Sequence, residues 1–405
     1  MASLSRAKQK SILAAGPKGP KGYLAGTDWL TIALCLAASA FGLLLVYSAV
    51  TFRQTPDHFP QKVIVSAAGV VIGLLAAIVM SFIDYELLLR FWYVMAGGCM
   101  LLMLLLIPFG VAANPARGDS RLWFELPGNI LFQPSELLKL AFIISFTWHL
   151  HLLRDRINKL KSIAQLGLHA FIPFAIVVYT GDLGSALVFL VIAGGMLFLA
   201  GLKLRWFMAL GALGGLSLPF VWIQLINSFQ KNRIYAVYMK DFLIAQTSET
   251  KYKDIIYQQQ QALNAIGSGQ LFGKGLFHAT VTVPVRDSDM IFSMAGEELG
   301  FVGCCAVLLV IAVVVIRLIM VSSRTRNLRA RLLCAGVAMM ISSQAVINVG
   351  MCIKLLPVIG ITLPFFSSGG SSNLCLYLAI GLVLTVFRHQ NEHEDTQSYF
   401  DYLYT

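Results

Sequence analysis

Long apolar stretches, separated by short polar ones, run through most of this chain. The clearest are residues 29–50, 63–82 and 91–109, which contain no charged side chain. Each holds about 20 residues, and a helix of that length crosses the roughly 30 Å hydrocarbon core of a bilayer. The pattern therefore predicts membrane-spanning helices.

The same pattern repeated along the chain predicts an all-α polytopic membrane protein with about ten spans. A large loop at about 226–288 separates the seventh span from the eighth and is expected to be extracellular. A smaller outward segment covers residues 111–133. The predicted spans are residues 29–50, 61–82, 90–110, 134–150, 163–180, 182–200, 205–225, 289–320, 330–354 and 371–387.

Both ends of the chain are predicted to be cytoplasmic tails around a single transmembrane domain at 29–388. Residues 1–28 are basic and rich in Gly and Pro, as in a disordered tail. The apolar stretch that follows is longer than the ~7–15 residues of a signal-peptide core, so the first span is expected to be retained. Residues 389–405 form the short C-terminal tail.

Composition supports the membrane class and explains the net charge. Hydrophobic residues make up 57% of the 405 and charged residues 13%, with a net charge of +11. The basic residues between spans fall in segments predicted to face the cytoplasm, which indicates orientation in a bacterial cytoplasmic membrane and not nucleic-acid binding. They are Arg154, Arg156, Lys159, Lys161, Lys203, Arg205, Arg317, Arg324, Arg326, Arg329 and Arg331.

No metal site is predicted. The seven cysteines lie in or beside apolar stretches without a Cys-x-x-Cys pair, and the seven histidines are scattered. We expect the cysteines to be packing residues.

Ionisable side chains inside the spans are the first candidates for function, because each costs about 2.5–3.5 kcal/mol or more at the bilayer centre. Glu136 and Lys139 stand three residues apart after Pro134, so they share one helix face. They are expected to pair, either as a structural salt bridge or as part of the lining of a substrate groove.

Acidic residues at predicted span boundaries have two interpretations. Asp182 lies in the short break between two predicted spans, where it would either cap the next helix or orient Lys139 or Arg121. Asp289, after Asp287, would either cap the following span or act as a general base at the outer membrane boundary. Glu297 and Glu298, within that span, require basic, hydroxyl or water partners.

Two glycine-containing runs complete the candidates. Residues 267–275 read Gly-Ser-Gly-Gln-Leu-Phe-Gly-Lys-Gly, which suits a sharp turn or a close backbone approach but lacks the spacing of a phosphate loop. Residues 364–373 place hydroxyls and glycines before the last span. They would form either a re-entrant turn or a helix start.

Taken in order, these segments resemble the SEDS family (shape, elongation, division and sporulation), which includes RodA, FtsW and SpoVE. The likeness covers nearly the whole chain. Four motifs carry it: Gln-Pro-Ser-Glu at 133–136, Asp-Leu-Gly-Ser-Ala at 182–186, the glycine-rich run at 265–275, and Gly-Gly-Ser-Ser at 369–372.

The resemblance implies a peptidoglycan glycosyltransferase that polymerises lipid II on the outer face of the cytoplasmic membrane. The family's catalytic aspartate maps to Asp289, before Glu-Glu-Leu-Gly at 297–300. As general base it would take the proton of the acceptor hydroxyl. Cations would stabilise the leaving pyrophosphate: a divalent ion (Mg²⁺ or Mn²⁺) or the side chains of Arg121, Lys139, Lys274 or Arg286.

This chain departs from the family pattern at three places. The usual His-Thr-Asp reads Asp-Ser-Asp at 287–289, so either Asp287 or Asp289 could be the base. Arg-Arg-Trp reads Arg-Leu-Trp, which keeps Arg121 and Trp123 as substrate-binding candidates. Ser-Tyr-Gly-Gly reads Ser-Ser-Gly-Gly, which adds Ser368 to them.

Other functions remain open at this point. A lipid II flippase or other transporter would also need Glu136, Lys139 and Asp182 in the membrane, and a scaffold would only recruit a wall synthase. The family implies a class B penicillin-binding protein, a transpeptidase, as partner. The Gly-Lys-Gly at 273–275 favours a RodA-like role in elongation over division or sporulation.

Overall fold

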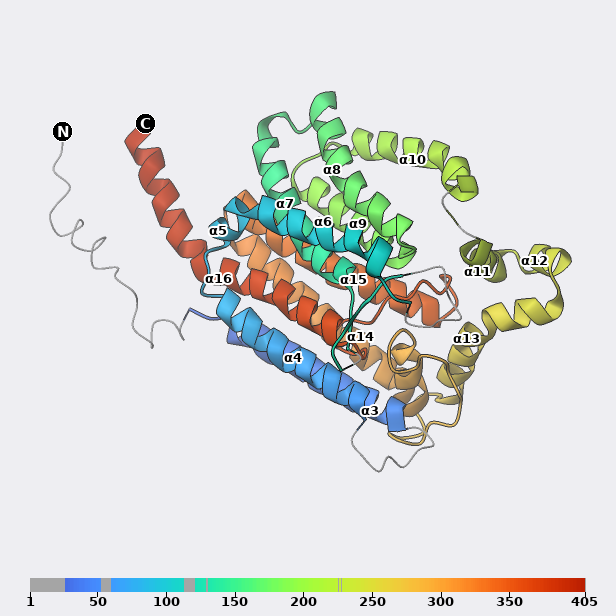
Figure 1. Ribbon diagram of the computed structural model, residues 1–405. Coiled ribbons are helices and arrows are strands. Elements are labelled where there is room, and N and C mark those ends of the chain that lie inside the picture. Colours follow the sequence, from blue (N-terminus) through green and yellow to red (C-terminus); the bar gives the residue numbers. More distant parts are fainter. Residues whose placement is uncertain are drawn as a thin grey trace.

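The computed structural model describes residues 26–51, 60–112, 121–128, 130–224, 226 and 228–404, and they are almost entirely helical (Figure 1). Nearly all of the predicted basic tail at 1–28 lies outside the described residues. So do residues 113–120 of the smaller outward loop. The membrane-protein fold class is confirmed by the helices that follow.

Ten helices match the ten predicted spans, with ends that differ by a few residues except at the end of α16, which runs on to Tyr404. Seven are long and apolar enough to cross a membrane by length and composition: α3 (Trp29–Thr51), α4 (Gln61–Met80), α6 (Trp92–Phe109), α8 (Leu160–Tyr179), α14 (Ile291–Arg324), α15 (Leu328–Cys352) and α16 (Gly370–Tyr404). The others are α7 (Pro134–Leu152), α9 (Leu183–Leu199) and α10 (Leu204–Gln224). The count of ten spans stays a prediction.

The segments between these helices contain shorter elements. A two-stranded antiparallel hairpin, β1 (Phe124–Leu126) with β2 (Ile130–Phe132), lies before α7 and pairs Phe124 with Phe132. The large loop is mostly helical. The remaining elements are α5 (Tyr85–Arg90), the 3₁₀ turn η2 (Arg154–Arg156), α11 (Ser228–Tyr238), α12 (Lys240–Gln246) and α13 (Glu249–Ser268).

Helices α4 and α16 lie side by side at backbone distance (Figure 1). A Cβ added at Gly69 would lie 2.5 Å from the carbonyl oxygen of Gly370, and one at Gly73 would lie 2.9 Å from the Cβ of Tyr377. Lipid tails are as apolar as Leu, so helices in a membrane associate through such close packing of small residues. The glycines make this seam possible.

Helix α7 lies at the centre of the bundle, in contact with α6, α8, α9, α15 and α16. Most of its side chains are buried, including Glu136 and Lys139. Its interior position explains why it carries charges that a lipid-facing helix could not.

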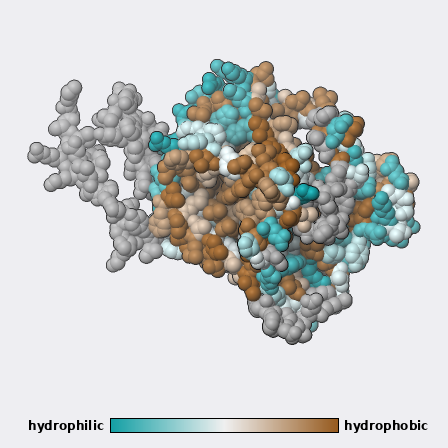
Figure 2. Space-filling view, viewed as in Figure 1, coloured by the Kyte–Doolittle hydropathy of each residue, from teal (hydrophilic) through white to brown (hydrophobic). Residues whose placement is uncertain are grey.

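Exposed apolar side chains cover the outside of the bundle, and hydrophilic residues gather near α11 and α12 (Figure 2). On α4, for example, Val71, Leu75 and Val79 are exposed. Such a surface suits lipid. Six of the seven cysteines are buried as predicted, whereas Cys305 is exposed on α14.

Helix α10 stands apart from the helical bundle (Figure 1). Between it and helices α8 and α9 lies an open, mainly apolar cavity of ≈ 1310 Å³. The polar end of the cavity is formed by Gln230, Arg233 and residues 356–360. At the other end of the chain, α16 continues as helix into the predicted C-terminal tail, up to Tyr404.

Candidate functional site

Asp287 and Asp289 lie in the turn that leads into α14. The helix begins at Ile291 after Met290, which makes no side-chain capping bond. Asp289 therefore does not occupy the N-cap position of α14 that one of its two interpretations gave it.

Asp287 is buried and held by two cationic or hydroxyl donors. Its Oδ2 accepts from Lys62 Nζ at 2.9 Å and from Ser368 Oγ at 2.8 Å. The Ser368 amide also donates to the Asp287 carbonyl at 2.7 Å. Asp287 thus connects the outer end of α4 to the start of α16.

Asp289 is half-buried, and its backbone is fixed from α15. Asn348 Nδ2 donates to its carbonyl oxygen at 2.8 Å, and also to the carbonyl of Ile361 at 2.7 Å. A Cβ added at Gly360 would lie 3.7 Å from Asp289 Oδ2. Because Gly360 lines the apolar cavity, the Asp289 carboxylate lies next to the polar end of that cavity.

The segment between α15 and α16, residues 353–369, connects the separate parts of the site. Gly184 at the start of α9 contacts it closely, since a Cβ there would lie 2.7 Å from the Ile359 carbonyl oxygen. Arg233 of α11 donates from Nη1 to the Val358 carbonyl at 2.6 Å. Residues 362–364 line a small polar pocket together with Glu136. The re-entrant interpretation and the helix-start interpretation of 364–373 both hold in part, since a turn with Phe365 at φ 68° precedes the helix that begins at Gly370.

The predicted pairing of Glu136 with Lys139 is confirmed. Lys139 Nζ lies 2.7 Å from Glu136 Oε1, with exposed side-chain fractions of 0% and 9%. A buried pair is costly to break because either partner alone would leave an uncompensated charge. The Lys139 ammonium is therefore already neutralised by Glu136.

Asp182 caps α9, as the first of its two interpretations states. Its Oδ1 accepts from the Ser185 amide at 2.9 Å. Its Oδ2 accepts from Gln133 at 2.9 Å and Ser135 at 3.0 Å, both in the Gln-Pro-Ser-Glu motif. These donors, rather than Lys139 or Arg121, hold the carboxylate, so the orienting role is not seen.

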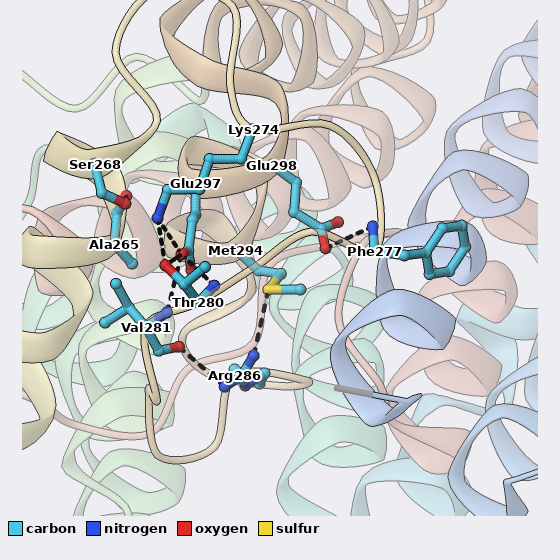
Figure 3. A network of polar contacts seen from close by, with 10 residues as sticks. All are labelled: Ala265, Ser268, Lys274, Phe277, Thr280, Val281, Arg286, Met294, Glu297 and Glu298. Atoms are coloured by element: carbon cyan, nitrogen blue, oxygen red, sulfur yellow. Dashed lines mark hydrogen bonds and ion pairs between the residues drawn. The ribbon is translucent and has the colours of Figure 1, made fainter. Parts of the chain in front are cut away.

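A second polar cluster surrounds Glu297, where the glycine-rich run meets α14 (Figure 3). Glu297 Oε1 accepts from Lys274 Nζ at 2.7 Å, from the Thr280 amide at 2.7 Å and from the Val281 amide at 2.9 Å. Lys274 also donates to Thr280 Oγ1 at 2.6 Å. Lys274 thus serves as the basic partner that Glu297 requires, and its ammonium lies in this cluster.

Glu298 finds its predicted hydroxyl partner on α3. Its Oε1 accepts from Ser48 Oγ at 2.5 Å and from the Phe277 amide at 2.9 Å. Figure 3 shows the Glu298 carboxylate directed at the backbone nitrogen of Phe277, whose ring points away. Glu297 therefore holds the two ends of the segment from Lys274 to Val281, and Glu298 holds its middle.

The glycine-rich run also pairs with the backbone of α14, which is broken at Gly300 (φ 67°). The amides of Lys274 and Gly275 donate to the carbonyls of Glu297 and Glu298 at 3.0 and 2.9 Å. Backbone groups freed by the break are thus satisfied within the protein, as a membrane interior requires.

Gly273→Ala is expected to destabilise this contact. Gly273 has φ 80°, and a Cβ there would lie 2.1 Å from the Glu298 carbonyl oxygen. The left-handed conformation alone costs an alanine about 1–2 kcal/mol, before the clash is counted. Thermal unfolding in detergent measures the loss. Gly267→Ala is the control, because its Cβ would meet nothing within 4 Å. Equal stability of the two variants would contradict the packing described.

The remaining candidates lie elsewhere. Arg121 is exposed beside the hairpin, and Trp123 forms a bridge with Val111. Arg286 is buried, and its Nη2 donates to the Val281 carbonyl at 3.0 Å. The structure thus brings Asp287, Asp289 and Ser368 together, and it places Lys274 and Arg286 in the loop beside Glu297.

Sequence reasoning missed Lys62, Ser48, Asn348 and Arg233. Asn348 is fully buried in α15, and amide side chains within an apolar span, here Gln344 and Asn348, were a usable signal. Lys62 and Arg233 gave no such signal, because both lie in polar sequence near predicted loop ends. Only the folded chain shows that they reach the site.

Two curated relatives match over most of their length. The probable peptidoglycan glycosyltransferase FtsW of Geobacter metallireducens is 30% identical over 365 residues, covering 89% of this chain and 94% of the relative. Stage V sporulation protein E of Bacillus subtilis is 32% identical over 371 residues, covering 89% and 97%.

Solved structures share the fold. One belongs to a peptidoglycan synthase complex studied for the coordination of polymerization and crosslinking, with a TM-score of 0.72, 28% identity, and coverage of 90% of this chain and 98% of that chain. Another, the rod shape determining protein RodA of Thermus thermophilus, has a TM-score of 0.63, 29% identity, and coverage of 90% and 97%.

The family comparison agrees with the sequence motifs. The model for FtsW, RodA and SpoVE, described as a cell cycle protein, matches residues 28–392. This range contains the described helices from α3 to α15, most of α16, and both clusters of the candidate site. The chain belongs to the FtsW/RodA/SpoVE family.

Proposed function

We propose that this chain polymerises lipid II into glycan strands on the outer face of the cytoplasmic membrane. Its family membership and its likeness to named peptidoglycan glycosyltransferases make it an enzyme of that class. The observation that carries the substrate proposal is the position of Asp289 next to a lipid-accessible apolar cavity. Transfer from a lipid-linked sugar needs both a base for the sugar hydroxyl and an apolar site for the lipid.

The cavity suits the lipid part of such a substrate. Its walls are apolar side chains of α8, α9 and α10, among them Phe171, Leu187 and Leu210. A polyprenyl chain would move from lipid into this cavity at little cost, because both surroundings are apolar. With the chain in the cavity, the pyrophosphate would lie at the polar end, beside Arg233 and Gln230.

The residues at that end support glycosyl transfer. Asp289 would accept the proton of the acceptor hydroxyl while this oxygen attacks the anomeric carbon of the donor, and the lipid pyrophosphate would leave with the bonding electrons. Arg233 would stabilise the charge that develops on the leaving group. Arg121, exposed on the outer loop, would be a second cation for it.

A divalent cation, Mg²⁺ or Mn²⁺, would share that charge if the enzyme uses one. The part of the chain that the structure describes holds no group of three His, Cys, Asp or Glu side chains suited to a metal. Most ligands of such an ion would therefore come from the substrate. The proton transfer to Asp289 does not depend on it.

The partner proposed is a class B penicillin-binding protein. Helices α11, α12 and α13 project from the end of the bundle, with Tyr238, Met239 and Phe242 exposed (Figure 1). The related synthase complex couples polymerization to crosslinking. The basic segments between spans support an orientation with α11–α13 outside and both termini in the cytoplasm.

The cellular role proposed is elongation, with division and sporulation as alternatives. The Gly-Lys-Gly at 273–275 supports a RodA-like role. The curated relatives described above carry the names FtsW and stage V sporulation protein E, which support the alternatives. Rescue of shape or of septation in a depleted bacterium separates these roles.

A flippase is the second candidate function, because Glu136 and Lys139 are charged groups inside the bundle. The test uses purified protein, its transpeptidase partner and lipid II in vesicles. We expect glycan strands on a denaturing gel. Translocation of lipid II without strands would favour the flippase, and strands made only by the partner would favour a scaffold.

A further inference from the structure

Three elements of the fold meet at the side chain of Asp287. Lys62 comes from the first turn of α4, Ser368 from just before α16, and Asp287 from the turn before α14. We call Lys62, Asp287 and Ser368 the Asp287 clamp. Asp287 stands where the family pattern has a histidine, so the clamp includes a departure specific to this chain.

The backbone around the clamp is fixed at three consecutive carbonyls. Ser368 N donates to the Asp287 carbonyl at 2.7 Å, Ser367 Oγ to the Ser288 carbonyl at 2.8 Å, and Asn348 Nδ2 to the Asp289 carbonyl at 2.8 Å. These donors are neutral and come from α15 and the segment before α16. The ion pair with Lys62 adds the link to α4.

The carboxylates of Asp287 and Asp289 lie two residues apart in the chain but have different surroundings. Asp287 Oδ2 already accepts from Lys62 and from Ser368, and the residue is 8% exposed. Asp289 is half-buried with its Oδ2 near Gly360, on the cavity side. An oxygen that accepts two short hydrogen bonds is poorly placed to take a proton from a substrate.

We propose that Asp287 is a positioning residue, and that its ion pair with Lys62 sets the orientation of Asp289. The proposal rests on the function proposed above. Lys62 pulls the Asp287 side chain towards α4 while Ser367, Ser368 and Asn348 hold the backbone, so the chain direction at 287–289 is determined. The Asp289 side chain then leaves this backbone towards the cavity.

Lys62 allows the role in orientation to be separated from a role in folding. Its side chain is 63% exposed, so removing the ammonium leaves no cavity in the core. The Lys62 ammonium lies in solvent, so removing it should cost little stability, and Ser368 still donates to the buried Asp287 carboxylate when it is gone. A small displacement of a catalytic group can nevertheless lower a rate up to a hundredfold. A change in rate without a change in stability is therefore the expected signature.

The first test compares Lys62→Met, Lys62→Arg and Asp287→Asn in the polymerase assay with the partner. We expect Lys62→Met to lower kcat about tenfold with KM changed less than about twofold, and Lys62→Arg to restore most of it. The double variant Lys62→Met with Asp287→Asn should lose no more than the larger single loss, because both changes remove one interaction. Arg154→Met is the matched control for activity, since it removes an exposed ion pair with Asp155 in η2, away from the proposed partner surface.

The second test does not depend on catalysis. Hydrogen exchange of the Ser368 amide, which donates to the Asp287 carbonyl, should be faster in Lys62→Met than in the wild type and unchanged in Arg154→Met. The exchange measurement tests the clamp even if the wild-type protein forms no polymer. The absence of polymer would overturn the proposed function and leave the clamp standing.

Three results would overturn the clamp. Wild-type rate and exchange in Lys62→Met would show that the ion pair orients nothing. A rise in KM alone would make Lys62 a substrate contact. Loss of activity in Asp287→Asn, with normal activity in Lys62→Met, would make Asp287 the base.

Discussion

Asp289→Asn should reduce glycan-strand formation by about 10²–10⁴-fold, the usual contribution of a general base. The amide keeps the size of the side chain and cannot accept the proton of the acceptor hydroxyl. Initial rates with purified lipid II and the transpeptidase partner measure the effect. Thermal unfolding should be unchanged, because the described contacts of Asp289 that fix its backbone go to its carbonyl oxygen.

The comparison with Asp287→Asn decides between the two acids. If Asp289 is the base, Asp287→Asn should lower the rate by roughly tenfold, which is the loss expected when only the position of Asp289 is disturbed. Equal strand formation by Asp289→Asn and the wild type would refute the assignment. Binding of lipid II, followed separately, should be retained in both variants.

Lys139→Met should destabilise the protein by about 3–5 kcal/mol, because it leaves Glu136 as an uncompensated charge in the bundle. Lys139 is 0% exposed and Glu136 9% exposed in the pair. The double change Glu136→Met with Lys139→Met should recover most of this stability, since apolar replacement of a buried ion pair is often neutral. Unfolding in detergent measures both.

The control for this prediction is Lys253→Met, which breaks the exposed Glu249–Lys253 pair on α13. That change should have little measurable effect on unfolding. If Lys139→Met were as mild, the interior pair would have to be solvated. Recovery of strand formation by the double variant would show that the pair supports packing and does not contact substrate.

The apolar pattern predicted the helices well because lipid imposes a simple rule on sequence. A spanning helix needs about 20 apolar residues, and few other elements do. The pattern does not show how the helices pack. α10 forms where the span at 205–225 was predicted but stands apart from the bundle, and the loop at 226–288 contains three helices whose mutual packing no periodicity shows.

The site was predictable residue by residue but not contact by contact. Glu136, Asp182, Asp289, Glu297 and Glu298 were all found, because a charge in a membrane is expensive. Their partners were found only where they lie close in sequence, as for Lys139. Lys274 was one of several candidate substrate cations, and nothing in the sequence shows that it also reaches Glu297, which is 23 residues away.

The glycine seam between α4 and α16 has a mechanical consequence. Backbones that touch at Gly69 and Gly370 leave no room to slide, so the two helices move as one rigid body. Lys62 lies at the start of α4 and Ser368 just before α16. We therefore expect the contacts of Asp287 to be stiff, and any rearrangement that admits a bulky lipid to involve α10, which lines the cavity and stands apart from the bundle.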